Sequence, residues 1–139
     1  LLKNTFRTDS HRLEIELTES AFSGLHETLV QPFEELQRLG VTLAMDDFGT
    51  GHSDLNRLIS LPFNHIKLDK RFCRGLSAAT GVTEIQAAVA LAQRLGIELT
   101  AEGVETLEQH QMLLALGVQR GQGYFYGAPQ SLSQWTSAR

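Results

Sequence analysis

Acidic residues in this sequence stand at or near the ends of short apolar stretches. These carboxylates are Glu16, Glu19, Asp46, Asp47, Asp69, Glu102 and Glu105. Hard divalent cations such as Mg²⁺ and Mn²⁺ take carboxylate and amide oxygens as ligands. One such carboxylate would mean little, but several at the ends of strand-like segments predict a ring of acidic groups that converges on metal.

The pair Asp46-Asp47 is the sharpest element of this pattern. It ends the apolar segment 41–45, and two adjacent carboxylates repel each other unless a cation lies near them. The first is suited to bridge two metal ions and the second to bind one of them. The alternative is that one aspartate faces the site while the other caps a helix or binds loop amides.

A glycine-rich loop, Gly49-Thr50-Gly51, begins one residue after this pair. Glycine allows positive φ and a close approach of the backbone to a ligand. Most such loops are simple turns, but a position next to two aspartates favours a lid or a loop that is coupled to the metal.

Lys67 lies in a strand-like segment between Ile66 and Leu68. A lysine that faces the mouth of a fold can stabilise phosphate charge or orient a water molecule. The alternative is an exposed lysine on the outer face of the strand. Asp69, two positions later, is expected to face the same way and to form an ion pair with Lys67.

Polar residues also end the last two strand-like segments. Glu102 ends segment 97–101 and has no simple structural explanation. Glu105 is expected in the first turn of the next helix, where the helix dipole favours an acidic side chain. Gln122 is the polar end of the last segment.

The apolar period alternates between about 2 and about 3.6, which predicts strands that alternate with helices. Strands are expected near 12–17, 41–46, 64–68, 97–101 and 118–122. Helices are expected over 24–39, 53–60, 82–95 and 106–116, the first with Pro32 delaying its start or kinking it. Three helix-glycine-strand junctions, at Gly40, Gly96 and Gly117, are typical of the tight turns in βαβ units and predict a parallel sheet.

Two architectures have such units, a doubly wound sheet and a (β/α)₈ barrel. Polar residues at the carboxyl ends of all five strands favour the barrel, which collects such ends around one mouth. A whole barrel takes about 250 residues, so the fold class expected for these 139 residues is α/β, a partial TIM-type barrel of about five units. Residues 1–139 are interpreted as one domain that lacks its N-terminal portion.

Composition narrows the classes of function. The formal net charge of −4 shows no excess of positive charge, which proteins that bind nucleic-acid polymers commonly have. The single cysteine, Cys73, rules out a disulfide within the chain and favours a reducing compartment, the cytoplasm. It is interpreted as a small buried hydrophobe. The histidines form no metal-binding pair, and four of them, His11, His26, His65 and His110, are interpreted as surface or packing residues. The aromatic residues Tyr124, Phe125, Tyr126 and Trp135 are expected in the core and the closure of the barrel, and the alternative is that Tyr124 or Phe125 contacts a nucleobase.

Five segments, in order and suitably spaced, resemble the successive motifs of the EAL domain family of bacterial cyclic-di-GMP phosphodiesterases. They are 16–19 (ELTE), 45–51 (MDDFGTG), 66–69 (IKLD), 101–106 (AEGVET) and 122–124 (QGY). The resemblance implies a modified TIM barrel that uses two Mg²⁺ or Mn²⁺ ions to hydrolyse cyclic di-GMP to linear pGpG in second-messenger signalling.

The resemblance also implies roles for single residues. Metal ligands would be Glu16, Asp46, Asp47 and Glu102. Lys67 would contact the attacking water or the scissile phosphate, Glu102 would act as general base, and Gln122 would position water. Substrate binding or support of the site would fall to Glu19, Gly49, Thr50, Gly51, Asp69 and Glu105. A homodimer through the region near loop 47–53 is expected, and contact with a membrane only through other parts of a parent protein.

The sequence departs from the family at several points. The letters Glu-Ala-Leu do not occur, and no asparagine matches the ligand that the family places before Glu16. His52 stands where tyrosine is usual, and Ala128 where arginine is usual. A non-catalytic module that binds a nucleotide or a protein is therefore the alternative function. We expect the isolated 139 residues not to hydrolyse cyclic di-GMP at an enzyme-like rate, and the parent protein to be active.

Overall fold

Five parallel strands form one sheet in the computed structural model, which describes residues 13–18, 21, 26–49 and 55–131. The strands are β1 (Glu14–Thr18), β2 (Thr42–Phe48), β3 (His65–Leu68), β4 (Glu98–Glu102) and β5 (Arg120–Gln122). The helices are α2 (His26–Arg38), α3 (Leu55–Ser60), α4 (Lys70–Arg74), the 3₁₀ turn η3 (Gly75–Ser77), α5 (Ala79–Leu95) and α6 (Leu107–Leu116).

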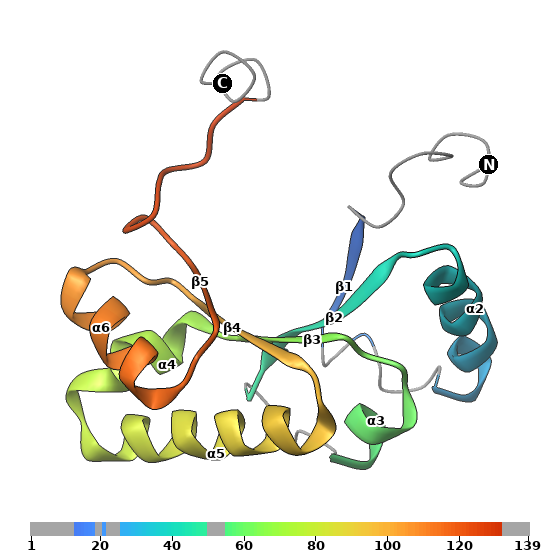
Figure 1. The fold of residues 1–139 in the computed structure, drawn as a ribbon, viewed down its shortest axis with the longest axis horizontal. Coiled ribbons are helices and arrows are strands. Elements are labelled where there is room, and N and C mark those ends of the chain that lie inside the picture. The colour runs from blue at the N-terminus through green and yellow to red at the C-terminus, as the bar shows by residue number, and fades with distance from the viewer. Residues whose placement is uncertain (1–12, 19–20, 22–25, 50–54, 132–139) are drawn as a thin grey trace.

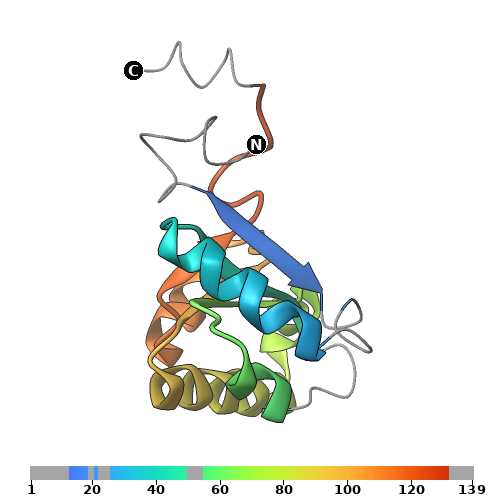
Figure 2. The same ribbon diagram turned by 90° about the vertical axis from the view of Figure 1, so that its right-hand side faces the viewer.

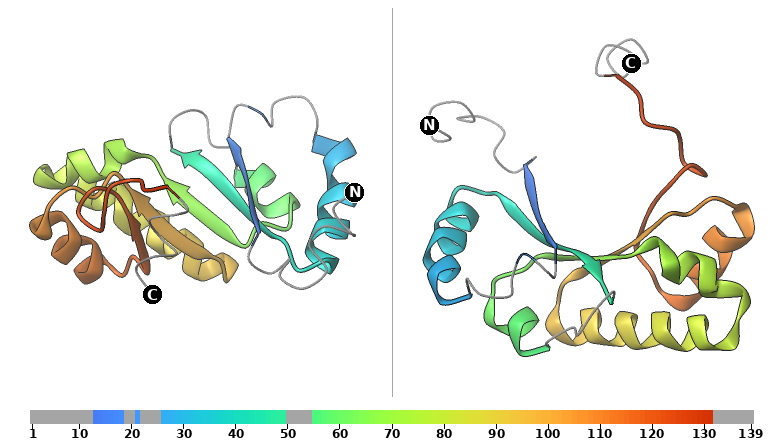
Figure 3. Two further views of the ribbon diagram at one scale, coloured as in Figure 1. Left: turned by 90° about the horizontal axis from the view of Figure 1, so that it is seen from above. Right: turned by 180° about the vertical axis from the view of Figure 1, so that it is seen from behind.

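The order of strands in the sheet is the order in the chain, and every neighbouring pair is parallel. The sheet is curved, and the helices lie along its outer side (Figure 1). Figure 2 shows the same sheet from its β1 edge, and the inner face of β1 to β3 is open to view in Figure 3, left. Helices on one side only are typical of consecutive barrel units, whereas a doubly wound sheet carries them on both faces. The predicted partial barrel is confirmed.

The large apolar strand residues face the helices, and the polar ones face the inner side. The outward residues join the hydrophobic core together with Phe33, Ile85, Val89 and Leu113 of the helices. These strand residues are Ile15, Leu17, Leu43, Met45, Ile66, Leu68, Leu99 and Ala101. Full burial of a large aliphatic side chain stabilises the fold by about 1.5–3 kcal/mol, so the outer layer holds the sheet in place.

The ends of α5 and α6 follow the sequence signals. Gly96 and Gly117 cap these helices in the left-handed conformation, with φ of 67° and 90°. Thr106 caps α6 and forms a capping box with Gln109, which stabilises the first turn. Helix α2 begins at His26 and continues through Pro32, so the proline does not delay its start to a later turn.

One helical stretch was not predicted, and one expectation about burial was wrong. Helix α4 and η3 lie where no helix was predicted, because five helical residues are too few to show a helical period. Three aromatic residues expected in the core are instead exposed, with 71% for Tyr124, 36% for Phe125 and 49% for Tyr126. Trp135 lies outside the described residues.

Cys73 is buried, as predicted. No helix in the described ranges has the length and apolarity that a membrane crossing needs.

Candidate metal and catalytic site

A bulge at the end of β2 turns two adjacent carboxylates toward the same side of the sheet. The pairing of β2 with β3 shifts register between Met45 and Phe48. Asp47 has a φ of 55°, in the left-handed region that aspartate tolerates better than most residues. Strict alternation would send Asp46 and Asp47 to opposite faces. The bulge removes this conflict, and the backbone N–H of Asp47 donates a 2.9 Å hydrogen bond to Oδ1 of Asp46.

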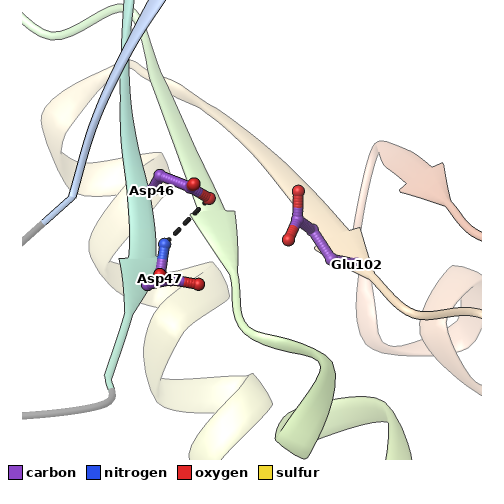
Figure 4. Close-up of side chains that lie close together, drawn as sticks. All are labelled: Asp46, Asp47 and Glu102. Atoms are coloured by element: carbon purple, nitrogen blue, oxygen red, sulfur yellow. Dashed lines mark hydrogen bonds between the residues drawn. The ribbon is translucent and has the colours of Figure 1, made fainter.

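Glu102, at the end of β4, completes an acidic cluster with this pair. One oxygen from each of the three carboxylates lies within 4.8 Å of the other two. Figure 4 shows Asp46 and Glu102 reaching toward each other across the strand between them. Burial and the charges of Asp46 and Asp69 raise the pKa of Asp47. Three half-buried carboxylates so close together form a suitable donor set for a hard divalent cation, because its charge offsets their repulsion.

Lys67 of β3 occupies the centre of the site. Its Nζ lies 2.6 Å from Oε1 of Glu16 and 2.7 Å from Oε1 of Glu102. The side chain is buried, with 5% of the residue exposed. Burial lowers the pKa of the ammonium group, but the hydrogen bonds and charges of Glu102 and Glu16 outweigh that effect and raise it. Lys67 therefore stays cationic and links β1 to β4 across β3. The alternative of an exposed lysine is wrong.

Asp69 takes a structural position at the start of α4. It caps the N-terminus of α4 through the backbone N–H of Arg71, and its carboxylate lies 3.0 Å from Nε of the same arginine. Its predicted ion pair with Lys67 is wrong, because β3 ends at Leu68 and the alternation of the strand ends with it. Arg71 also donates a 2.6 Å hydrogen bond to the carbonyl oxygen of Gly49. Gly49, shortly after the aspartate pair, is thereby tied to α4.

Gln122 and Glu105 line a cavity of about 570 Å³ beside the acidic cluster. Gln122 pairs in register with Glu102. Glu105 precedes the helix cap Thr106, so its expected place in the first turn of α6 is wrong. The other lining residues are Lys70, Arg74, Gly103, Gly123, Tyr124, Gly127, Ala128, Pro129 and Gln130. The volume is in the range that holds a small-molecule ligand.

Two basic residues of this cavity, Lys70 and Arg74, were missed by the sequence analysis. Their signal was the run Lys70-Arg71 directly after a strand end, with Arg74 one turn later. The cavity places cationic side chains near Glu102, because its lining residues Gly103 and Gln122 are the chain neighbour and the register partner of Glu102. This arrangement is suited to an anionic ligand held beside a metal. Three residues with predicted support roles, Glu19, Thr50 and Gly51, lie outside the described residues.

A protein-family model described as the EAL domain matches residues 2–129. Among relatives by sequence, the cyclic di-GMP phosphodiesterase RocR of Pseudomonas aeruginosa is 38% identical over 129 residues, which are 92% of this chain and 33% of RocR. The chain spans between 15% and 33% of the length of RocR and three other relatives that it matches.

Solved structures agree with this match. The EAL domain of Mycobacterium smegmatis DcpA superposes with a TM-score of 0.90 at 35% identity, over 99% of this chain and 62% of that chain. Klebsiella pneumoniae BlrP1, in complex with manganese and cyclic di-GMP, gives a TM-score of 0.77 at 31% identity, over 85% of this chain and 30% of that chain.

Proposed function

The chain belongs to the EAL domain family, and from that premise we propose that its site hydrolyses cyclic di-GMP to linear pGpG with the help of divalent metal. The observation that carries this proposal is the cluster of Asp46, Asp47 and Glu102 around the buried Lys67. The relative RocR, a cyclic di-GMP phosphodiesterase, and the complex of BlrP1 with manganese and cyclic di-GMP support it.

Asp46, Asp47, Glu102 and Glu16 are the residues that would hold Mg²⁺ or Mn²⁺. Bound metal would neutralise phosphate charge and lower the pKa of a water molecule. Glu102 is placed to accept a proton from the attacking water, since its carboxylate lies near the aspartate pair and contacts Lys67. The Lys67 ammonium stays charged and donates to a phosphate oxygen as negative charge develops there.

The cavity next to the cluster would hold the rest of the substrate. Lys70 and Arg74 supply positive charge for the second phosphate, and Gln122 orients water at the mouth. Tyr124 is 71% exposed, so its ring is available to stack on a guanine base. Glu105, which also lines this cavity, supports the substrate.

The test measures pGpG from cyclic di-GMP by chromatography, using the natural polypeptide that carries these residues. We expect product with Mn²⁺ or Mg²⁺, none with a chelator, and a loss of more than about 100-fold in kcat for Asp46→Asn, which removes one ligand charge. Glu98→Gln is the matched control, because Glu98 pairs with Arg120 away from the acidic cluster.

The non-catalytic alternative makes the opposite prediction. If the protein bound cyclic di-GMP with either metal but released no pGpG, it would be a binding module. The isolated 139-residue chain, measured in parallel, is expected to form product far more slowly than the natural polypeptide. Equal rates would contradict this expectation.

We further propose a cytoplasmic location and a homodimer through the region near loop 47–53. The single cysteine and the intracellular nature of a second messenger support the location. The dimer is supported by the family resemblance alone, and light scattering on the purified protein tests it.

A further inference from the structure

Three polar residues form a second bridge across the inner face, one layer below Lys67. Nδ1 of His65 in β3 lies 2.9 Å from Oε2 of Glu14 in β1, and its Nε2 lies 2.5 Å from Oγ1 of Thr100 in β4. His65 and Thr100 are each 5% exposed. We refer to Glu14, His65 and Thr100 as the lower bridge.

The lower bridge joins the same three strands as Lys67. Glu14, His65 and Thr100 each stand two residues before Glu16, Lys67 and Glu102 in the sequence. Side chains two apart on a strand share a face, so each member lies directly below its counterpart in the site. The two layers hold β1 and β4 at fixed distances on either side of β3.

The hydrogen-bonding roles in the lower bridge follow from its partners. An ionised Glu14 carboxylate only accepts, so Nδ1 of His65 carries a hydrogen and donates to it. In the neutral ring, Nε2 then accepts from the Thr100 hydroxyl. A buried imidazole with both nitrogens satisfied has one favoured orientation, because rotation would leave polar atoms unpaired.

We propose that His65 is a positioning residue that fixes the spacing of Glu16 and Glu102, and so prepares the site to bind metal. The role in metal binding rests on the proposed function, whereas the effect on the Lys67 contacts does not. Without the His65 hydrogen bonds, β1 and β4 lose their link directly below the site. The Lys67 ion pairs then lengthen, and the carboxylates around them become less ordered.

The lower bridge also has the order of groups found in a nucleophilic triad, a carboxylate, a histidine and a hydroxyl. Its burial argues for positioning, because Thr100 and His65 expose almost no surface to a substrate. Labelling of Thr100 by a fluorophosphonate would show a reactive hydroxyl and would overturn the proposal.

The test uses three substitutions of His65 in the full chain. His65→Leu removes both hydrogen bonds while keeping an apolar side chain of similar reach. His65→Asn retains a donor near the position of Nδ1, and His65→Gln a polar group near the position of Nε2, so each keeps one of the two contacts. The readouts are Mn²⁺ affinity by electron paramagnetic resonance and the NMR signal of the Lys67 ammonium group, assigned by its loss in Lys67→Met.

We expect His65→Leu to weaken Mn²⁺ binding about 10-fold and to weaken or remove the Lys67 signal. A loss of about 10-fold is at the lower end of the losses in metal affinity seen when residues that support metal ligands are mutated. His65→Asn and His65→Gln should show smaller effects. Glu98→Gln, which breaks the exposed pair with Arg120 on adjacent strands, should leave both readouts unchanged.

The proposal is overturned if the three substitutions lower only the melting temperature and leave Mn²⁺ affinity and the Lys67 signal as in the wild type. If His65→Leu does not fold, the Asn and Gln variants decide the question. If the wild-type protein binds no Mn²⁺, the proposed function fails. The Lys67 signal in the His65 variants still decides the positioning role. A weakened or missing signal supports that role, and an unchanged signal refutes it.

Discussion

The backbone N–H of Asp47 donates a 2.9 Å hydrogen bond to the carboxylate of Asp46. This contact closes the bulge of β2 and brings both side chains toward Glu102. It also places two negative charges on neighbouring residues. The same geometry that suits a cation therefore works against the metal-free fold.

Asp47→Asn is expected to stabilise the metal-free protein while weakening metal binding. Burial, Asp46 and Asp69 raise the pKa of Asp47, so its ionisation costs stability as the pH rises through that pKa. At pH 7 the neutral asparagine avoids this cost, and it tolerates a positive φ as aspartate does. The gain should stay below about 1 kcal/mol, because the site is partly solvated.

Urea unfolding of both proteins in the presence of a chelator measures this difference. The advantage of Asp47→Asn should disappear below the ordinary carboxyl pKa of 3.8, where Asp47 is protonated in both the folded and the unfolded state. Mn²⁺ should stabilise the wild type more than the variant. A variant that is less stable at pH 7 and equally stabilised by Mn²⁺ would contradict the prediction.

Lys67→Met should destabilise the protein by about 1–3 kcal/mol, because Glu16 and Glu102 lose a charged hydrogen-bond donor. Glu102 and Glu16 raise the pKa of Lys67 above its ordinary value of 10.5. The stabilisation is therefore complete below that value and is lost as the pH rises through the raised pKa.

Chemical denaturation across pH tests the Lys67 prediction. The difference in free energy of unfolding between wild type and Lys67→Met should stay constant from about pH 6 to about pH 9 and shrink only under strongly alkaline conditions. A difference that changes near neutral pH would mean that another group controls this interaction.

Gly123→Ala and Gly127→Ala form a matched pair. The two glycines have nearly the same backbone conformation, with φ of 156° and 154°. A Cβ at Gly123 would collide with the backbone N and carbonyl oxygen of Val104, whereas at Gly127 it would meet nothing within 4 Å. We expect Gly123→Ala to cost at least about 2 kcal/mol more than Gly127→Ala, a typical overpacking cost. Melting temperatures measure the difference, and equal losses would show that the turn after Gln122 shifts freely.

Cys73 should resist alkylation in the folded protein. Burial, followed by the charges of Glu102 and Glu105, raises the pKa of its thiol to about 11. Since the thiolate is the reactive form, the shift alone should slow reaction with iodoacetamide at pH 8 by about 100-fold relative to the same chain in denaturant. Mass spectrometry after timed quenching gives both rates. Rapid labelling under native conditions would place the thiol at the surface.

The period of apolar residues predicted most of the fold and brought the main site residues together. Strand ends identified Asp46, Asp47 and Glu102 as one cluster, and the reason is physical, since parallel strands present their carboxyl ends at one edge. The family match also agrees with the motifs read from the sequence. The roles of single residues in the reaction remain predictions.

Contacts that depend on strand register or on local backbone geometry could not be predicted from the sequence. The bulge at Asp47 breaks the alternation that sequence reasoning assumes. Glu16 and Lys67 stand 51 residues apart, and only the pairing of β1, β2 and β3 brings them together. The lower bridge was missed for the same reason, since His65 has no sequence neighbour that marks it as polar and buried.

The alternation along each strand also places the residues that pack the scaffold and the residues that can bind a ligand at different positions. Outward positions such as Leu43 and Ile66 carry the packing of the helices and tolerate little change. Inward positions outside the two bridges, such as Glu98, lie apart from that packed layer. A lineage that alters such positions can acquire a new ligand without rebuilding its scaffold, and a protein engineer who seeks a new specificity has the same positions at hand.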